Sequence, residues 1–342
     1  MPETYSSPKV LIAGGAGYIG SHTAKLFYHA GIVPVVLDNL STGNRDALRF
    51  GPFYEGSIAD SKLIARIIEQ HQPIGAILFA GAAYVGESTE NPRKYFRNNV
   101  SDSICFLDAM VDGGVRRVVF SSSCCVYGNV QESISIREDS ATAPLSPYGE
   151  TKLFLEKVLR WYGSAYGLQS ICLRYFNAAG ADTEGELGEL HDPETHLIPL
   201  AIQAAMGGKP LRIFGTDYAT PDGTAIRDYT HVTDLADGHL RALRHLLDGG
   251  ESLTLNLGTG IGHSVRQVIR AVEQQAGLAV PVKYGARRDG DAPALVADPS
   301  RAREVLGWVP ECSSLETIVG TAWRWYRELH RPPRQCALAA AE

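Results

Sequence analysis

The 342-residue chain carries 32 Lys and Arg against 38 Asp and Glu, a formal net charge of −6. That balance excludes the strongly basic surface typical of nucleic-acid-binding proteins. No apolar run reaches the ~20 residues of a membrane-spanning helix, and residues 1–8 lack the features of a secretory signal. We therefore expect a cytoplasmic protein, without a nucleic-acid or membrane partner, that forms one large domain or two closely associated ones.

The six cysteines form no CxxC pair. Their spacing predicts neither a redox couple nor a structural zinc site, and no metal is expected. The neighbouring Cys124 and Cys125 are interpreted as small buried residues.

Residues 9–175 alternate strand-like and helix-like segments, which is typical of a parallel sheet covered by helices on both faces. Strands are expected at residues 9–13, 33–37, near 53, and at 75–79, 117–120 and 170–175. Helices are expected at residues 23–30, 57–71, 91–112 and 147–166. The periodicity of the third helix places on one face the apolar residues Phe96, Val100, Ile104, Leu107 and Met110. The pattern predicts an α/β fold with a doubly wound parallel sheet.

Beyond about residue 180 the rhythm changes. Residues 181–194 are loop-like and rich in Gly, Glu and Asp, and loops of this length tend to be functional. Helices are expected at residues 197–206, 232–247, 264–275 (capped by Ser264) and 315–329, with a strand at 253–257. We predict a first domain of residues 1–180 and a smaller, interleaved C-terminal domain of residues 181–342, some segments of which return to the first.

A glycine-rich stretch, residues 14–22, links the first strand to the first helix. Its glycines let backbone N–H groups approach an anion, and the helix N-terminus adds about half a positive charge. Asp38 ends the second strand about 20 residues later, where a carboxylate binds an adenosine ribose and disfavours the extra phosphate of NADP. The first domain is therefore predicted to be an NAD-binding domain of the Rossmann type.

Tyr148 and Lys152 stand four residues apart on an expected helix, so they project from one face. A free tyrosine has a pKa of about 10, and a nearby ammonium and a positive nicotinamide would both lower it. Ser123 follows the fifth strand, at the edge where open α/β sheets bind ligands. The three side chains predict a proton-handling set beside a hydride carrier.

Together these motifs resemble those of the extended short-chain dehydrogenase/reductases, and among them the nucleotide-sugar 4-epimerases. The resemblance extends over about residues 9–330. Its carriers, in chain order, are residues 14–22, 38–40, 79–81, 85–88, 98–100, 121–123, 126–128, 146–152, 173–177, 214–218, 222–224, 227–229, 231–232 and 287–291.

The resemblance implies a retained NAD and a UDP-sugar substrate. It implies NAD contacts at Gly14, Gly17, Tyr18, Ile19, Gly20, Asp38, Asn39, Ser57, Ile58, Phe79, Ala80, Gly81, Asn98, Ser121, Tyr148, Lys152 and Tyr175. It implies substrate contacts at Ser123, Tyr148, Asn177, His196, Leu197, Phe214, Arg227, Arg288, Asp291 and Leu295. In these roles Tyr148 is the base, Ser123 supports it, Lys152 lowers its pKa, and the two arginines bind the diphosphate. A homodimer packed through residues 91–112 and 147–166 is also implied.

The implied reaction interconverts UDP-glucose and UDP-galactose through a transient 4-keto sugar. Leu295 leaves open the N-acetyl sugars UDP-GlcNAc and UDP-GalNAc, and residues 83–86 resemble epimerases of UDP-xylose and UDP-arabinose. Dehydratases and UDP-glucuronate decarboxylases are disfavoured, because Cys124 and Cys125 stand where dehydratases carry acids. A non-catalytic NAD-binding regulator would be expected to lack the Tyr148/Lys152 pair.

Three positions depart from the family pattern. Ser57 stands where an Asp is frequent, Ala83 and Tyr84 occupy the region of a common Lys, and His196 replaces a common Asn. The first two departures put single contacts to NAD in doubt.

Overall fold

A seven-stranded parallel sheet forms the centre of the computed structural model, which describes residues 7–128, 135–288 and 291–330. The strand order is β11-β7-β5-β4-β1-β2-β3, so the chain starts in the middle and winds outward in both directions. The strands are β1 (Lys9–Ala13), β2 (Val33–Asp38), β3 (Phe53–Glu55), β4 (Ala76–Leu78), β5 (Arg117–Ser123), β7 (Gln169–Tyr175) and β11 (Leu253–Leu257). The doubly wound parallel sheet is confirmed.

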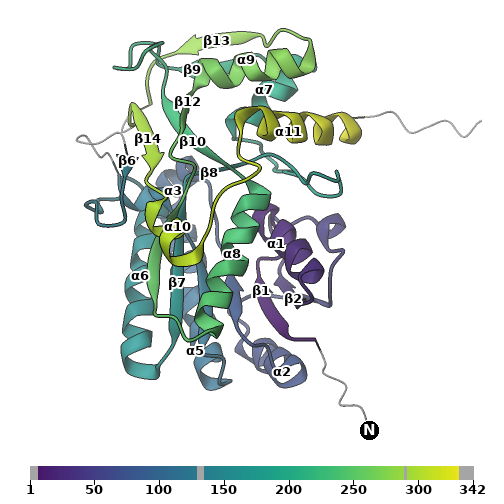
Figure 1. Cartoon of the computed structure of the whole chain (residues 1–342), viewed down its shortest axis with the longest axis vertical. Coiled ribbons are helices and arrows are strands. Elements are labelled where there is room, and N and C mark those ends of the chain that lie inside the picture. Colours follow the sequence, from purple (N-terminus) through teal and green to yellow (C-terminus); the bar gives the residue numbers. More distant parts are fainter. Residues whose placement is uncertain (1–6, 129–134, 289–290, 331–342) are drawn as a thin grey trace, which may run out of the picture.

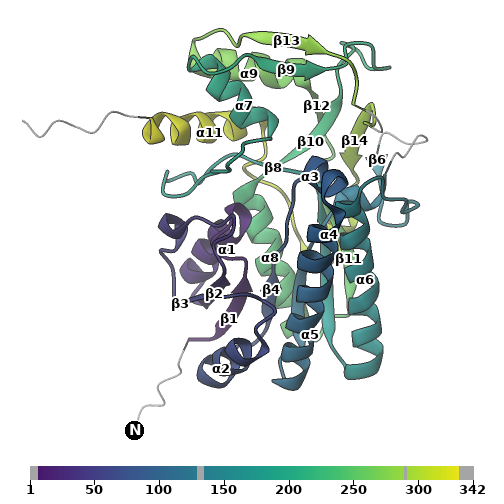
Figure 2. The ribbon, with the colours of Figure 1, turned by 180° about the vertical axis from the view of Figure 1, so that it is seen from behind.

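Both faces of this sheet are buried under helices (Figures 1 and 2). Leu11 and Ala13 of β1 face one layer, and Val10 and Ile12 face the other, because side chains alternate along a strand. The first layer holds α2 (Ser61–His71), α5 (Asp102–Asp112) and α6 (Pro147–Tyr166). The second holds α1 (Tyr18–His29), α8 (Val232–Leu247) and α10 (Ser300–Leu306). Burial on both sides explains why the central strands β1, β2 and β4 are almost entirely apolar.

Helix α2 begins later than expected. The side chain of Asp60 accepts a hydrogen bond from the backbone N–H of Leu63 at 3.0 Å and so caps a helix that starts at Ser61. Residue 57, where the sequence predicts the helix to begin, lies in the turn before it.

The single helix expected over residues 91–112 is broken. It consists of α4 (Pro92–Tyr95), a π-helical turn (Phe96–Ser101) and α5. The wider turn rotates the apolar face, so Phe96 is 46% exposed while Leu107 and Met110 are buried. Asn99 stabilises the turn, because its side chain bonds to the backbone of Ala82 and, at 3.1 Å, to the hydroxyl of Thr151.

Smaller sheets and a group of helices form the other part of the molecule, at the top of Figure 1. One sheet has the order β12-β10-β14-β6, with β8 pairing β10, and β9 pairs β13 separately. Its strands and those of the separate pair are β6 (Ser135–Ile136), β8 (Asn177–Ala179), β9 (Leu211–Phe214), β10 (Ile226–His231), β12 (Gly262–Ser264), β13 (Val282–Gly285) and β14 (Ala294–Ala297). The sequence does not predict these strands, which are short and in several cases polar.

Three helices pack around a separate apolar core in this part: α7 (Leu197–Ala205), α9 (Val265–Ala276) and α11 (Leu315–Leu329). Ser264 and Gln267 form the reciprocal capping box that starts α9, as the expected cap at Ser264 requires. The short helix α3 (Val85–Glu90) lies outside this group and packs against α4 and α6. Within the described ranges, no helix is long and apolar enough to cross a membrane.

Candidate active site

The glycine turn after β1 leaves no room for a side chain at Gly14 or at Gly20. Gly14 has a φ of +83°, and a Cβ there would lie 2.5 Å from the backbone nitrogen of Ala80. A Cβ on Gly20 would lie 2.2 Å from the carbonyl oxygen of Gly14. Gly17, at the N-cap of α1, offers no capping side chain, and the first turn carries no acidic residue. The N–H groups of this turn are therefore suited to an anion.

Asp38 lies beside this turn at the end of β2. Its Oδ2 accepts a hydrogen bond from Ala16 N at 2.9 Å, and its Oδ1 accepts one from Leu40 N at 2.8 Å. Burial raises the pKa of this carboxyl, and the two backbone donors oppose the rise. Each oxygen has a second lone pair, so the carboxylate can still accept hydrogen bonds from a ligand's hydroxyl groups.

Ser123, Tyr148 and Lys152 converge where the end of β5 meets the start of α6. Ser146 caps α6 by accepting from Gly149 N at 3.2 Å, which places the first turn of the helix against β5. The ammonium of Lys152 donates to the carbonyl oxygen of Ser121 at 2.7 Å and lies 5.7 Å from the centre of the Tyr148 ring. All three side chains are more than nine-tenths buried.

Burial dominates the titration of this group. It raises the pKa of Tyr148 well above its usual value, Cys125 and Tyr175 add to the rise, and the hydrogen bond with Ser123 opposes it. Burial also lowers the pKa of Lys152 to about 8. Desolvation of the phenolate therefore outweighs the hydrogen bond with Ser123, and the ammonium of Lys152 is bonded to Ser121. That Lys152 and a positive nicotinamide together lower the pKa of Tyr148 remains a prediction.

A second cluster gathers two arginines around Asp291. Arg227 of β10 pairs with its carboxylate, and Arg288 lies 3.3 Å from its other oxygen. The hydroxyl of Tyr218 donates to the same carboxylate at 3.3 Å, and the Arg288 guanidinium lies 4.9 Å from the centre of the Phe214 ring. Two cations face one anion here, so the cluster keeps a positive charge. Residues 289–290 of the predicted motif lie outside the described residues.

Leu295 and Asn177 lie between the two clusters. Leu295 on β14 is opposite Arg227 in the parallel pairing with β10, and it packs on a core cluster that includes Cys124. Asn177 on β8 donates to the carbonyl oxygen of Asp228 at 2.8 Å. These contacts bring the arginine cluster next to the Ser123, Tyr148 and Lys152 group.

Most of the remaining residues predicted to contact the cofactor lie at the carboxyl ends of parallel strands, which share one edge of the sheet. Tyr18, Ile19 and Asn98 lie on helical segments instead. Asn39 follows β2, Ser57 and Ile58 follow β3, and residues 79–81 follow β4. Ser121 lies two residues before the end of β5, and Tyr175 is the last residue of β7. Asn98 accepts from Ala82 N at 2.9 Å. Tyr18 and Ile19 open α1.

His196 and Leu197, which are predicted to contact the substrate, do not lie in the arginine cluster. They form the N-cap and first residue of α7, and His196 contacts Glu189 and Glu194 instead of the arginine cluster. Glu189, His191 and Glu194 are not among the predicted site residues, although their close spacing with His196 in the sequence is a signal that could have indicated them.

Comparison with known proteins is consistent with this geometry. Residues 10–258 match the family model described as the NAD dependent epimerase/dehydratase family. The chain belongs to this family. A UDP-glucose 4-epimerase of Azospirillum brasilense is 49% identical to the chain, with 96% of the chain and 95% of the relative covered.

Solved structures of the family also match. The UDP-glucose 4-epimerase of Brucella ovis in complex with NAD has a TM-score of 0.91 and 52% identity, over 93% of this chain and 98% of that one. That of Stenotrophomonas maltophila, with bound NAD and formylated UDP-arabinopyranose, has a TM-score of 0.91 and 39% identity, over 94% and 98%.

The residues present fit NAD, the family's cofactor. The Gly14 and Gly20 positions exclude any Cβ, and the uncapped N-terminus of α1 can receive a pyrophosphate. Asp38 offers a carboxylate to the adenosine ribose.

Several side chains that border this site were not predicted. Tyr95 donates to the carbonyl oxygen of Tyr84 at 2.7 Å and packs edge-on against Tyr148, with ring centres 6.5 Å apart. His239 of α8 lies 4.6 Å from the Phe79 ring centre and 6.0 Å from that of Tyr175. No short motif marks either residue, because each reaches the site through tertiary packing.

Proposed function

We propose that the chain is a UDP-glucose 4-epimerase, interconverting UDP-glucose and UDP-galactose through a transient 4-keto sugar. The observation that carries the proposal is the convergence of Ser123, Tyr148 and Lys152 at the end of β5. They lie in the same fold as the glycine turn and Asp38, which fit NAD. Family membership and relatives of that name support it.

In this proposal Tyr148, as phenolate, removes the proton from the sugar 4-hydroxyl, and Ser123 donates a hydrogen bond to the same oxygen. Lys152 would hold the nicotinamide ribose by a hydrogen bond, and its charge favours the phenolate. Because burial raises the pKa of Tyr148, the base needs positive charge near it to form at neutral pH. Bound NAD would supply reversible hydride exchange with C4 of the sugar.

In this proposal the protein binds the substrate mainly through its diphosphate. Arg227 and Arg288 present forked guanidinium groups that suit phosphate oxygens, and Phe214 borders the base. Asn177, His196, Leu197, Asp291 and Leu295 complete the proposed contacts. The 4-keto sugar can then rotate about the fixed diphosphate and present its opposite face.

We also propose that residues 1–180 form the NAD-binding domain and that residues 181–342 form the domain that binds the UDP-sugar. Parts of the second range still build the first sheet: β11 extends it and α8 covers it.

We propose a cytoplasmic location for the chain. The five cysteines that the structure describes are all free, as is usual in reducing compartments, and this supports the proposal.

A homodimer is proposed through α4–α5 and α6. Phe154 and Trp161 lie seven residues apart on α6, so they share a face, and they are 48% and 73% exposed. Phe96 in the adjoining π-helical turn is 46% exposed. Large apolar side chains gathered on neighbouring helices are typical of a partner surface.

The function is tested by turnover of UDP-galactose to UDP-glucose without added NAD. We expect the purified chain to carry NAD and to interconvert the two sugars. Protein that holds no dinucleotide and leaves UDP-galactose unchanged would count against the proposal. A comparison with UDP-GalNAc and UDP-arabinose, for wild type and Leu295→Tyr, tests the sugar preference.

A further inference from the structure

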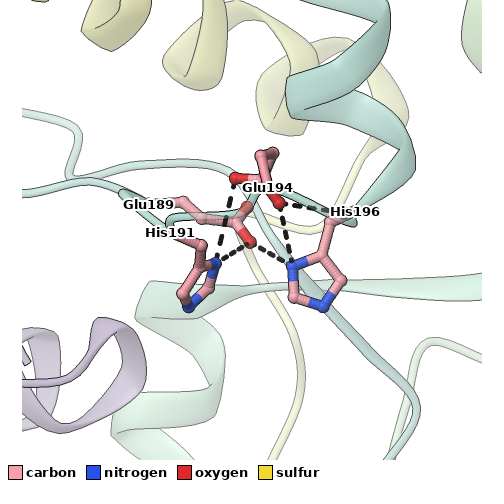
Figure 3. A group of neighbouring side chains, drawn as sticks. All are labelled: Glu189, His191, Glu194 and His196. Atoms are coloured by element: carbon pink, nitrogen blue, oxygen red, sulfur yellow. Dashed lines mark hydrogen bonds and ion pairs between the residues drawn. The ribbon is translucent and has the colours of Figure 1, made fainter. Parts of the chain in front are cut away.

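Four side chains converge between the loop of residues 181–194 and the start of α7: Glu189, His191, Glu194 and His196 (Figure 3). We call them the Glu/His cluster. Both imidazoles turn their Nδ1 atoms toward the two carboxylates. One nitrogen or oxygen from each residue lies within 4.8 Å of those from the other three.

The spacing of these atoms suits tetrahedral coordination. The Nδ1 atom of His191 lies 3.1 Å from Glu189 Oε1 and 3.8 Å from Glu194 Oε2, and that of His196 lies 3.6 Å from Glu194 Oε1. Ligands about 2.0–2.1 Å from a tetrahedral zinc are about 3.4 Å apart. The two imidazoles approach different oxygens of Glu194. His196 Nδ1 contacts Glu189 Oε1 more closely, so these two atoms must move apart when an ion enters.

Among the described residues, no lysine or arginine pairs with the two carboxylates of the cluster. Glu189 is 2% exposed, and within the described residues the ion-pair contacts of Glu189 and Glu194 are with these two histidines only. The nearby acidic trio differs, because Asp182, Glu184 and Glu186 all contact the ammonium of Lys25. The Glu/His cluster is therefore the acidic group of this loop without a lysine or arginine counter-ion.

One ligand atom contacts the carboxylates without forming a hydrogen bond. The Nδ1 of His191 is shielded from solvent and makes no hydrogen bond, although it lies 3.1 Å from Glu189 Oε1. A buried polar nitrogen without a hydrogen bond is unfavourable, and it is satisfied when its lone pair binds a metal ion.

Surrounding groups orient the carboxylates, as outer groups do in metal sites. Glu194 Oε1 accepts from the backbone N–H of Thr195 at 2.7 Å and of His196 at 2.9 Å, and Glu194 Oε2 accepts from the Tyr326 hydroxyl at 3.2 Å. Trp325 donates to the backbone carbonyl of Glu189 at 3.0 Å. Helix α11 therefore supports both acidic residues.

We propose that the Glu/His cluster binds one divalent transition-metal ion, with zinc the best chemical match. Two imidazole nitrogens and two carboxylate oxygens suit zinc, whereas magnesium and calcium prefer oxygen ligands throughout. Four protein ligands leave no open position, so the ion is structural and links the 181–194 loop to α7. Residues 189–196 have the pattern Glu-x-His-x2-Glu-x-His, which the spacing of the cysteines does not address.

The test measures metal in the whole chain, purified with any histidine tag removed and incubated with zinc chloride before exhaustive desalting. We expect roughly one zinc per chain by mass spectrometry, and a zinc content several-fold lower in His191→Ala and in Glu194→Gln. We also expect a chelator to lower the melting temperature of the wild type and to leave that of His191→Ala unchanged.

His29→Ala is the matched control, because His29 is exposed and lies outside the cluster. It should keep the wild-type zinc content. Retained NAD and an unchanged circular dichroism spectrum would show that a variant is folded. The proposal is overturned if the wild type takes up no zinc, or if folded His191→Ala and Glu194→Gln bind as much zinc as His29→Ala.

Discussion

At the scale of single residues, the site places ionisable groups where water cannot reach them. Tyr148 and Lys152 are both buried, and burial moves their pKa values in opposite directions, each toward the neutral form. The sequence predicts that these residues meet, because helical spacing is local. It does not predict the direction of the Tyr148 shift, which depends on how completely α6, β5 and Tyr95 surround the ring.

Tyr148→Phe removes only the phenolic oxygen. We expect turnover of UDP-galactose to fall about 10²–10⁴-fold, because the 4-hydroxyl loses its base. The chain should still retain NAD, since the glycine turn and Asp38 are untouched. Turnover is followed by coupled assay, and released dinucleotide is quantified after denaturation. A variant with near-normal turnover would refute the role of Tyr148.

Lys152→Met should stabilise the NAD-free chain at neutral pH. The folded pKa of about 8 lies below the unfolded value, so the buried ammonium destabilises the fold below pH 8, and this penalty is relieved as pH rises toward about 10. We expect a gain of up to about 3 kcal/mol near pH 7 that shrinks near pH 9.5. Urea denaturation measures it, with exposed Lys157→Met as control. An equal gain at both pH values would contradict the burial argument.

At the scale of elements, local signals account for the long helices. α6 and α8 have the predicted bounds, because a capping side chain starts each one and apolar residues recur at helical spacing. The strands of the smaller sheets escape prediction, because β10 has the sequence Ile-Arg-Asp-Tyr-Thr-His and its buried Asp228 is satisfied by Thr259, Gly260 and Ala297. Such burial of polar residues depends on partners far along the chain.

One buried ion pair joins three elements of the large sheet and its helical layer. Arg174 of β7 bonds to both carboxylate oxygens of Glu156 on α6, and Ser122 of β5 donates to the same carboxylate. Glu156→Gln should cost about 3–5 kcal/mol, because it leaves a buried guanidinium without its counter-ion. Urea denaturation measures the loss, and exposed Glu69→Gln on α2 should cost almost nothing. Equal midpoints for the two variants would show that the pair is not needed.

At the scale of the whole molecule, the sequence predicts an NAD-binding domain in the first part of the chain. It does not predict how the loop of residues 181–194 folds. Lys25 on α1 ties this loop to the glycine-turn helix through Asp182, and the Tyr18 hydroxyl donates to Gly180 O at 2.6 Å. These contacts span about 160 positions, which no local pattern encodes. The same loop brings together the Glu/His cluster.

The proposed dimer makes a prediction at this scale. Trp161→Glu places a charge on the exposed face of α6, so the chain should become monomeric in solution. Light scattering after size exclusion measures the mass. Leu278→Glu, at a 47% exposed position in the other part of the molecule, should leave the mass unchanged. A monomeric wild type would rule the dimer out.

The path of the chain between the sheets constrains how this enzyme can be re-engineered. After β7 in the large sheet the chain enters β8 beside β10, then α8 and β11 return to the large sheet, and β12 leaves it again. The residues proposed to bind the UDP-sugar therefore do not form one contiguous segment. A chimera with a different sugar preference would have to exchange residues on both sides of α8 and β11 together, since a single crossover near residue 180 would also replace an edge strand of the large sheet.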